Sequence, residues 1–163
     1  MGLTALAPLH CLRSLSLIEC EVVDAALPIV ATLASLEQVN LDFCRHITDT
    51  GIAALGALGD LRVLNARGCE RVRGEGFAAL SDCTALTALN LSWTPRLTLG
   101  GVEALCGLSG LQELWLPWCG LSNRQVQSLA ALTGLRGLSV ANTTDLTATG
   151  IEVLVRGCRS LTR

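Results

Sequence analysis

A nine-residue pattern, L-x-x-L-x-L-x-x-C, recurs along nearly the whole chain and restricts the folds that this chain can adopt. Its copies start 24, 25, 25, 25 and 24 residues apart, at Leu12, Leu36, Leu61, Leu86, Leu111 and Leu135. A fixed period of this length is typical of a solenoid, in which each unit packs against its neighbours. We therefore expect one domain over residues 1–163, with six full repeats, a partial repeat at each end, and an origin in a longer array.

Each repeat divides into a strand half and a helix half. Alternating apolar positions in the first half predict a short strand. In the second half apolar residues follow at three-residue steps, as in Ile52, Leu55 and Leu58, which predicts one buried face of a helix of about two to three turns. The expected helix N-caps are Thr48, Thr98, Ser122 and Thr147.

Stacking is what allows units of this size to fold. Burial of roughly eight apolar side chains, at about 1.5–3 kcal/mol each, barely matches the entropy cost of ordering one repeat. Neighbouring repeats cover further apolar surface, and their strands pair at about 4.8 Å per repeat while the wider helices splay apart. The expected fold class is an α/β solenoid curved like a horseshoe, with parallel strands on the concave face and short helices on the convex face.

The unit LEQVNLDFCRHITDTGIAALGALGD, residues 36–60, resembles the cysteine-containing class of leucine-rich repeat, L-x-x-L-x-L-x-x-C-x-x-I-T-D-x-G-I-x-x-L. The resemblance covers essentially the whole chain. Departures that we expect to weaken single repeats are Thr94 and Thr143 in place of Cys, Ala66 in place of Leu, and LSNRQVQSL without the usual Gly. The resemblance implies a substrate receptor of an F-box ubiquitin ligase, although nothing in residues 1–163 looks like an F-box.

The eight cysteines favour a structural interpretation over disulfides or zinc. Cys20, Cys44, Cys69 and Cys119 share one repeat position, which we call the cysteine column, and no C-x-x-C occurs. We expect these thiols to turn inward beneath a turn and to bond a backbone carbonyl. Neighbouring members would lie only about 5 Å apart, so a disulfide is sterically possible. Cys11 and Cys106, outside the column, are expected to react first with thiol reagents.

Catalysis, membranes and nucleic acid are disfavoured. No nucleotide, zinc-protease or serine-hydrolase motif occurs, and His10 and His46 are the only histidines. We therefore expect no enzyme, cofactor or metal, with His46 facing solvent. The uncharged stretch at residues 25–36 is too short to cross a bilayer, and no basic signal-peptide region opens the chain. We expect an intracellular protein, cytoplasmic or nuclear, that binds no membrane.

Nucleic acid is the last class of partner that the composition addresses. Arg62, Arg67, Arg71 and Arg73 lie close together, but two glutamates lie among them and the net charge is −2. We interpret them as a solvated rim and expect no nucleic-acid partner.

The chain's three Trp all fall on columns that should face outward from the sheet. Trp115 follows the second pattern leucine, whereas Trp93, Trp118 and Phe43 stand just before the cysteine column. We expect Trp93 and Trp118 to be neighbours, with Trp115 about 10 Å further back. The candidate protein-binding residues are Trp115, Trp118, Trp93, Glu113, Asn90, Arg67, Asn65, Asp42, Asn40 and Phe43.

Two interpretations of the aromatic residues remain open. Exposed Trp beside an acid resembles a binding hot spot, but Trp93, Trp118 and Phe43 could instead pack over the turn below. The favoured function is a noncatalytic module that binds a protein on its concave face and is a monomer once its ends are capped. A structural scaffold or surface-recognition segment is the alternative, and an enzyme is a distant third.

Overall fold

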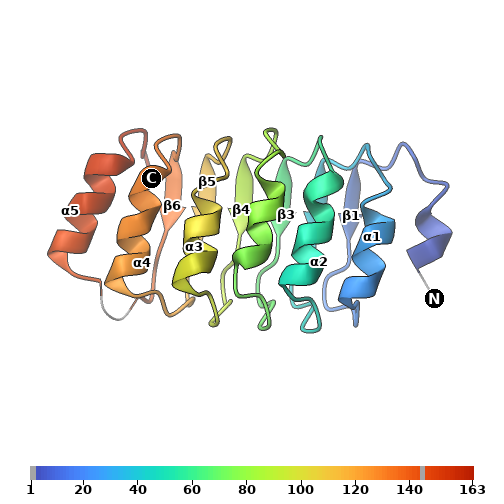
Figure 1. Cartoon of the computed structure of the whole chain (residues 1–163), viewed down its shortest axis with the longest axis horizontal. Helices are drawn as coiled ribbons and strands as arrows, with labels where there is room; N and C mark the ends of the chain where they lie inside the picture. The colour runs from blue at the N-terminus through green and yellow to red at the C-terminus, as the bar shows by residue number, and fades with distance from the viewer. Residues whose placement is uncertain (1–2, 144–145) are drawn as a thin grey trace.

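Six parallel strands form one sheet within residues 3–143 and 146–163, which the computed structural model describes (Figure 1). Each strand pairs with the equivalent residues of the next repeat, so that Leu64 lies opposite Leu89 and Asn90 opposite Trp115. The predicted strand in each repeat is therefore confirmed. The strands are β1 (Ser14–Ser16), β2 (Gln38–Asn40), β3 (Val63–Asn65), β4 (Ala88–Asn90), β5 (Glu113–Trp115) and β6 (Gly137–Ser139).

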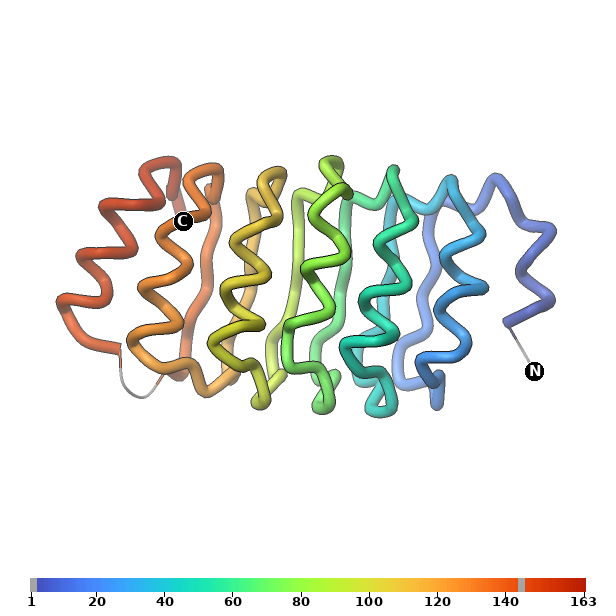
Figure 2. Tube along the Cα trace, in the orientation of Figure 1, coloured from blue at the N-terminus to red at the C-terminus, as the bar shows by residue number. Residues whose placement is uncertain are grey.

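The helices form a second layer that covers one face of the sheet (Figures 1 and 2). Most are shorter than two turns, and several contain a 3₁₀ segment. The α-helices are α1 (Leu27–Val30), α2 (Asp49–Ala54), α3 (Leu99–Leu105), α4 (Asn123–Ser128) and α5 (Ala148–Gly157). The 3₁₀ helices are η1 (Leu3–Leu6), η2 (Asp24–Ala26), η3 (Leu55–Ala57), η4 (Glu75–Leu80) and η5 (Leu129–Ala131).

The four predicted N-caps are confirmed. Thr48, Thr98, Ser122 and Thr147 each accept a hydrogen bond from a backbone N–H in the first turn of the following helix. The repeat that starts at Leu61 instead has Gly74 at this place, with φ of 103° and no side-chain cap. The predicted α-helix does not form in the described residues of this repeat. The 3₁₀ helix η4 takes its place.

One continuous core lies between the two layers. The pattern leucines Leu61, Leu64 and Leu89 are fully buried, and so is the helix face of Ile52 and Leu55. Ala66, which replaces a pattern leucine, is also fully buried. Because every repeat contributes to this core, the sheet and the loops at its ends are held in a regular row (Figure 2).

The cysteine column is confirmed for three of its four members. Cys44, Cys69 and Cys119 are buried, and their thiols donate to carbonyl oxygens of the preceding repeat at 2.9–3.2 Å: Leu17, Leu41 and Leu91. The prediction is wrong for Cys20, which is exposed. Cys20 follows β1, the first strand of the sheet, so no earlier strand turn of the described chain covers it.

The residue that replaces the usual Gly in the fifth repeat is Gln125, and it strengthens the helix start. Its side-chain oxygen accepts from the Ser122 backbone N–H at 2.8 Å, which completes a capping box. Its amide nitrogen donates to the Leu97 carbonyl of the preceding repeat at 2.9 Å. We expected this departure to weaken the repeat, but Gln125 adds two hydrogen bonds that a glycine could not make.

The described helices include none with the length and apolar character that crossing a membrane requires.

Candidate binding surface at the strand ends

The position before the cysteine column, which we call the turn column, has a left-handed backbone in every full repeat. Its φ angles lie between 57° and 67°, and its members are Glu19, Phe43, Gly68, Trp93, Trp118 and Asn142. Glycine takes this conformation freely and Asn takes it readily, whereas a bulky side chain there costs about 1–2 kcal/mol. Three of the six positions nevertheless hold a large aromatic residue.

Trp93 and Trp118 are stacked on each other and open to solvent. Their ring centroids are 5.1 Å apart with an angle of 23° between the ring planes. The two side chains are 46% and 50% exposed, so about half of each remains open to solvent and neither belongs to the buried core. Their predicted proximity is confirmed, and they extend from the edge of the sheet at which the strands end. We call this edge the turn edge; it is the lower edge in Figure 1.

Phe43 behaves differently from the tryptophans. A Cβ atom added at Gly68 would collide with the Phe43 ring, which shows that the ring lies over the neighbouring turn. The guanidinium of Arg67 stands over the same ring, 5.2 Å from its centroid. Phe43 therefore packs over the neighbouring turn, as the packing interpretation expects, whereas the rings of Trp93 and Trp118 stay about half exposed.

Shallow grooves adjoin the aromatic residues along the turn edge. One groove of about 380 Å³ is lined by Phe43, Arg45, Gly68, Glu70, Trp93, Pro95 and Trp118. A second groove of about 350 Å³ is lined by Pro95, Trp118, Gly120, Asn142 and Thr143. Pro95 and Trp118 line both, so Trp118 stands between the two grooves.

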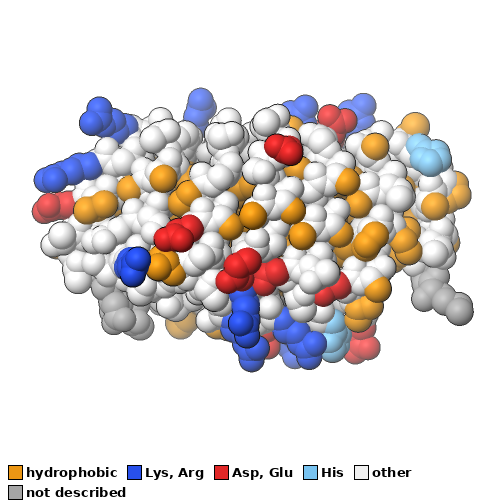
Figure 3. Space-filling model, in the orientation of Figure 1, with side chains coloured by type: hydrophobic (Ala, Val, Ile, Leu, Met, Phe, Trp, Pro, Cys, Tyr) orange, Lys and Arg blue, Asp and Glu red, His pale blue; other side chains and the backbone are white. Residues whose placement is uncertain are grey.

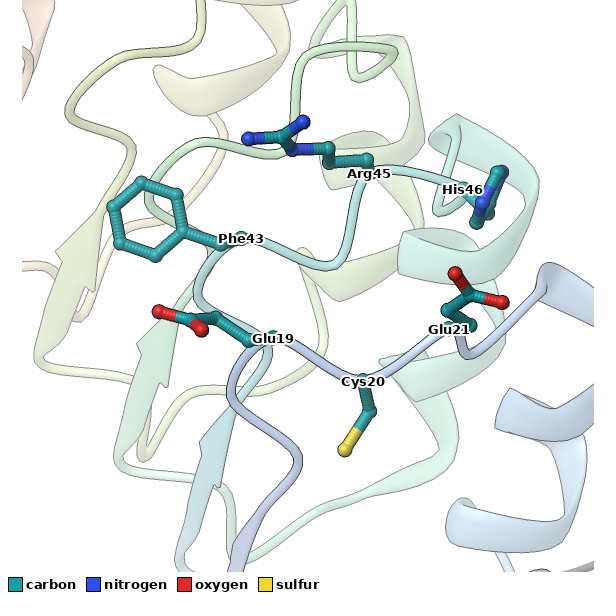
Figure 4. A pocket seen from close by; sticks show the side chains of 6 residues that line it. All are labelled: Glu19, Cys20, Glu21, Phe43, Arg45 and His46. Carbon is teal, nitrogen blue, oxygen red and sulfur yellow. The ribbon is translucent and has the colours of Figure 1, made fainter.

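A third groove of about 450 Å³ lies nearer the N-terminus, lined by Glu19, Cys20, Glu21, Phe43, Arg45 and His46 (Figure 4). The Phe43 ring and the Glu19 carboxylate extend in the same direction from neighbouring turns, whereas the Cys20 thiol points away from Arg45 and His46. His46 is exposed, as predicted. Arg45, Glu70 and Pro95 were missed as groove residues, although a signal exists: they occupy one column, two residues after the turn column.

The polar candidates on the strands shape the turns that follow. Asn40 accepts from the Asp42 backbone N–H at 2.8 Å, and Asn90 accepts from the Ser92 N–H at 3.0 Å. Asp42 in turn accepts from the Arg67 backbone N–H at 2.9 Å. Asn40, Asn65, Asn90 and Asp42 are all half-buried. This group therefore holds the strand ends in register in addition to lining the strand face.

Trp115 and Glu113 are less available than predicted. Trp115 lies in β5 between Asn90 and Ser139 and is half-buried rather than fully exposed. The Glu113 carboxylate pairs with the Arg163 guanidinium, and a Cβ at Gly137 would collide with it. Glu113 is therefore not the free acid beside Trp115 that the hot-spot interpretation assumed.

Burial suppresses the reactivity of most thiols. Desolvation raises the pKa of Cys44, Cys119 and Cys106, and it raises the pKa of Cys69 to about 12. Cys11 and Cys20 are exposed. We therefore expect thiol reagents to label these two cysteines first, with Cys20 in place of Cys106. Among the residues that the structure describes, no three His, Cys, Asp or Glu side chains gather as a metal site would require.

Comparison with known proteins gives one family and several folds of the same kind. A family model described as Leucine Rich repeat matches residues 32–56 and 82–106. A search of curated proteins finds no match. The fold is similar to that of internalin C2 from Listeria monocytogenes, with 26% identity over 92% of this chain and a TM-score of 0.70.

Two further structures share the fold at lower identity. One is Rad7 in the yeast Rad7 and Elc1 complex, with 18% identity, 88% of this chain covered and a TM-score of 0.70. The other is from a TLR13–ssRNA13 complex, with 22% identity, 99% covered and a TM-score of 0.62. This chain spans 59% of internalin C2, 39% of the chain from the Rad7 complex and 22% of the chain from the TLR13 complex.

Proposed function

We propose that this chain, which belongs to the leucine-rich-repeat family, is a noncatalytic protein-binding module whose partner lies across the strand face and the turn edge. Repeats of this family are generally protein-interaction modules. Within that general role, the proposal assigns the contact to the tryptophan pair at the turn edge and to Trp115 on the adjoining strand face.

The observation that carries the proposal is the exposed Trp93–Trp118 stack at left-handed backbone positions. Glycine at the same position, as at Gly68, avoids the conformational cost, and neither ring belongs to the buried core. Tryptophan is enriched at the energetic centres of protein interfaces because one rigid side chain supplies a large contact area. The conformational cost of two large side chains that stay half exposed is accounted for if the rings bind a partner.

The strand-face residues supply the remainder of the proposed surface. Trp115 gives a partly covered apolar contact, and Asn90, Asn65 and Asn40 follow it in register on the preceding strands, with Asp42 and Arg67 just beyond two of those strands. Apolar and hydrogen-bonding groups side by side are the usual composition of a specific interface.

The finer form of the proposal is a substrate-recognition part of an F-box-type ubiquitin ligase. It is supported by the resemblance of the cysteine-containing repeats alone, because the likeness to Rad7, 18% identical, concerns the fold. The alternative is a scaffold or surface-recognition segment with no link to ubiquitin. We also propose a reducing intracellular location, because Cys44, Cys69 and Cys119 act as hydrogen-bond donors only in the thiol form.

The test is capture of partners from extract by three variants of the immobilised chain. Trp93→Gly with Trp118→Gly, and separately Trp115→Ala, should weaken retention of the bound protein by about thirtyfold, the effect of losing roughly 2 kcal/mol at a hot spot. The control is Ile151→Ala with Val155→Ala, which removes exposed apolar side chains of α5 on the helix layer. Retention unchanged in both tryptophan variants, or lost equally in the control, would contradict the proposal.

A further inference from the structure

Four exposed arginines lie in the segments that follow β3 and β4 at the turn edge. Arg67, Arg71 and Arg73 belong to the third repeat, and Arg96 follows Pro95, which lines both grooves at Trp118. In Figure 3 basic side chains gather below the middle repeats, with acidic side chains just above them. Within the described chain, Arg45 pairs with Glu70 at 3.9 Å, but no ion pair involves the other four arginines.

The acids nearby are directed at other donors. Asp49 accepts from the backbone N–H groups of Arg73, Gly74 and Gly76 at 2.8–3.0 Å. Asp42 accepts from the Arg67 backbone N–H, and Glu75 accepts from the Thr98 hydroxyl. These carboxylates hold consecutive repeats together. Their charge keeps the strip close to neutral, but the guanidinium donors remain free to bind an acceptor from outside.

We propose that the turn edge of the third to fifth repeats binds an extended acidic peptide segment of the partner protein. Its carboxylates pair with Arg71, Arg73 and Arg96, and its apolar side chains lie in the grooves on either side of Trp118. Guanidinium forks match carboxylates geometrically, and apolar side chains suit hollows of about 350–380 Å³. The inference rests on the proposed function and names the chemistry that this surface recognises.

The dimensions of the strip suit a short peptide. Neighbouring turns are about 4.8 Å apart, and an extended chain advances about 3.3 Å per residue, so three repeats accommodate about four or five residues. A single-stranded nucleic acid is less well matched, because its phosphates need cations along the whole path. The turn edge instead carries Glu19 and Glu21 toward one end, and Gly120, Asn142 and Thr143 toward the other.

The experiment is a selection of peptides from a random twelve-residue library displayed on phage, with the Trp93→Gly, Trp118→Gly variant used to remove peptides that bind elsewhere. We expect the retained peptides to be enriched in Asp and Glu and to contain apolar residues. Synthetic copies should bind about threefold to tenfold more weakly to Arg71→Gln with Arg96→Gln, since each exposed charge pair contributes modestly. The matched control is Arg136→Gln with Arg159→Gln, which changes net charge equally at exposed sites outside the strip and should leave affinity unchanged.

Other results would overturn the inference. They are enrichment of neutral or basic peptides, equal weakening by the control variant, no peptide retained, or tighter binding of a mixed-sequence single-stranded RNA that depends on Arg71 and Arg96. The capture experiment is independent of these results. If the tryptophan variants lose the natural partner while the selected peptides are not acidic, the proposed function stands and the acidic-segment inference fails. If the tryptophan variants lose no partner, the proposed function itself fails.

Discussion

At the scale of single residues, the buried cysteines act as neutral hydrogen-bond donors between repeats. Cys69 donates to the Leu41 carbonyl and Cys119 to the Leu91 carbonyl, each across one repeat boundary. A thiolate could neither donate nor tolerate this burial, and desolvation accordingly raises the pKa of both thiols. The column position predicted these contacts from sequence, but not the exposure of Cys20, because burial there depends on a preceding turn.

This arrangement predicts a loss of stability at alkaline pH. The unfolded thiols ionise near pH 9, while folded Cys69 holds its proton to about pH 12. The contribution of Cys69 to the free energy of unfolding is therefore fully present below about pH 9 and is lost as the pH rises toward 12. The chain has no Lys and no Tyr, so cysteines dominate titration in this window. Urea unfolding under reducing conditions at about pH 8 and about pH 11 measures the loss. Cys69→Ala should reduce the pH dependence; an unchanged dependence would contradict this explanation.

At the scale of secondary-structure elements, the close contact of consecutive helix starts depends on a glycine before the first buried apolar residue. A Cβ at Gly101 would collide with the Arg73 carbonyl oxygen, and a Cβ at Gly76 would collide with the Asp49 carbonyl oxygen. The sequence periods predicted a strand and a helix face in each repeat. They could not predict that η4 is 3₁₀ throughout. They showed that a glycine is missing at Gln125, but not that its side chain donates to the Leu97 carbonyl of the preceding repeat.

Two adjacent glycines of α3 test this packing argument. Gly101→Ala should destabilise the chain by about 1–3 kcal/mol, because the added methyl group has no space. Gly100→Ala is the matched control: its Cβ would be 3.9 Å from the nearest atom, so better helix propensity should stabilise by about 0.4–1 kcal/mol. Thermal or urea unfolding of both variants decides the matter. Similar effects of the two substitutions would show that helix propensity, not contact between repeats, sets the requirement.

At the scale of the whole molecule, the array separates a regular scaffold from a variable edge. The core runs through all repeats, whereas the ends are less well covered: Leu9 is 46% exposed and Val155 is 58% exposed. The fold could be predicted because its repeats obey one pattern. For the candidate site, the exposure of Trp93 and Trp118 could be predicted from their columns, but the half-burial of Trp115 and the pairing of Glu113 could not, because both depend on neighbouring strands.

The left-handed conformation of the turn column could not be read from the sequence. Only Gly68 among its members shows the usual residue for that backbone conformation, so the pattern of side chains concealed a shared geometry. Once the conformation is known, Trp93 and Trp118 are costly residues at exposed positions where glycine would suffice. Binding and stability should therefore respond in opposite ways to the substitution of one tryptophan by glycine.

The most direct measurement compares Trp118→Gly with Trp118→Ala for affinity toward the captured partner and for free energy of unfolding. Both substitutions remove the ring, but only Ala keeps a Cβ at a left-handed φ of 60°. We predict that both variants lose about thirtyfold in affinity, while the Gly variant is the more stable by about 1 kcal/mol. Parent-like affinity in the Gly variant, or affinity that follows stability across the pair, would contradict the claim that the exposed ring is held for a partner.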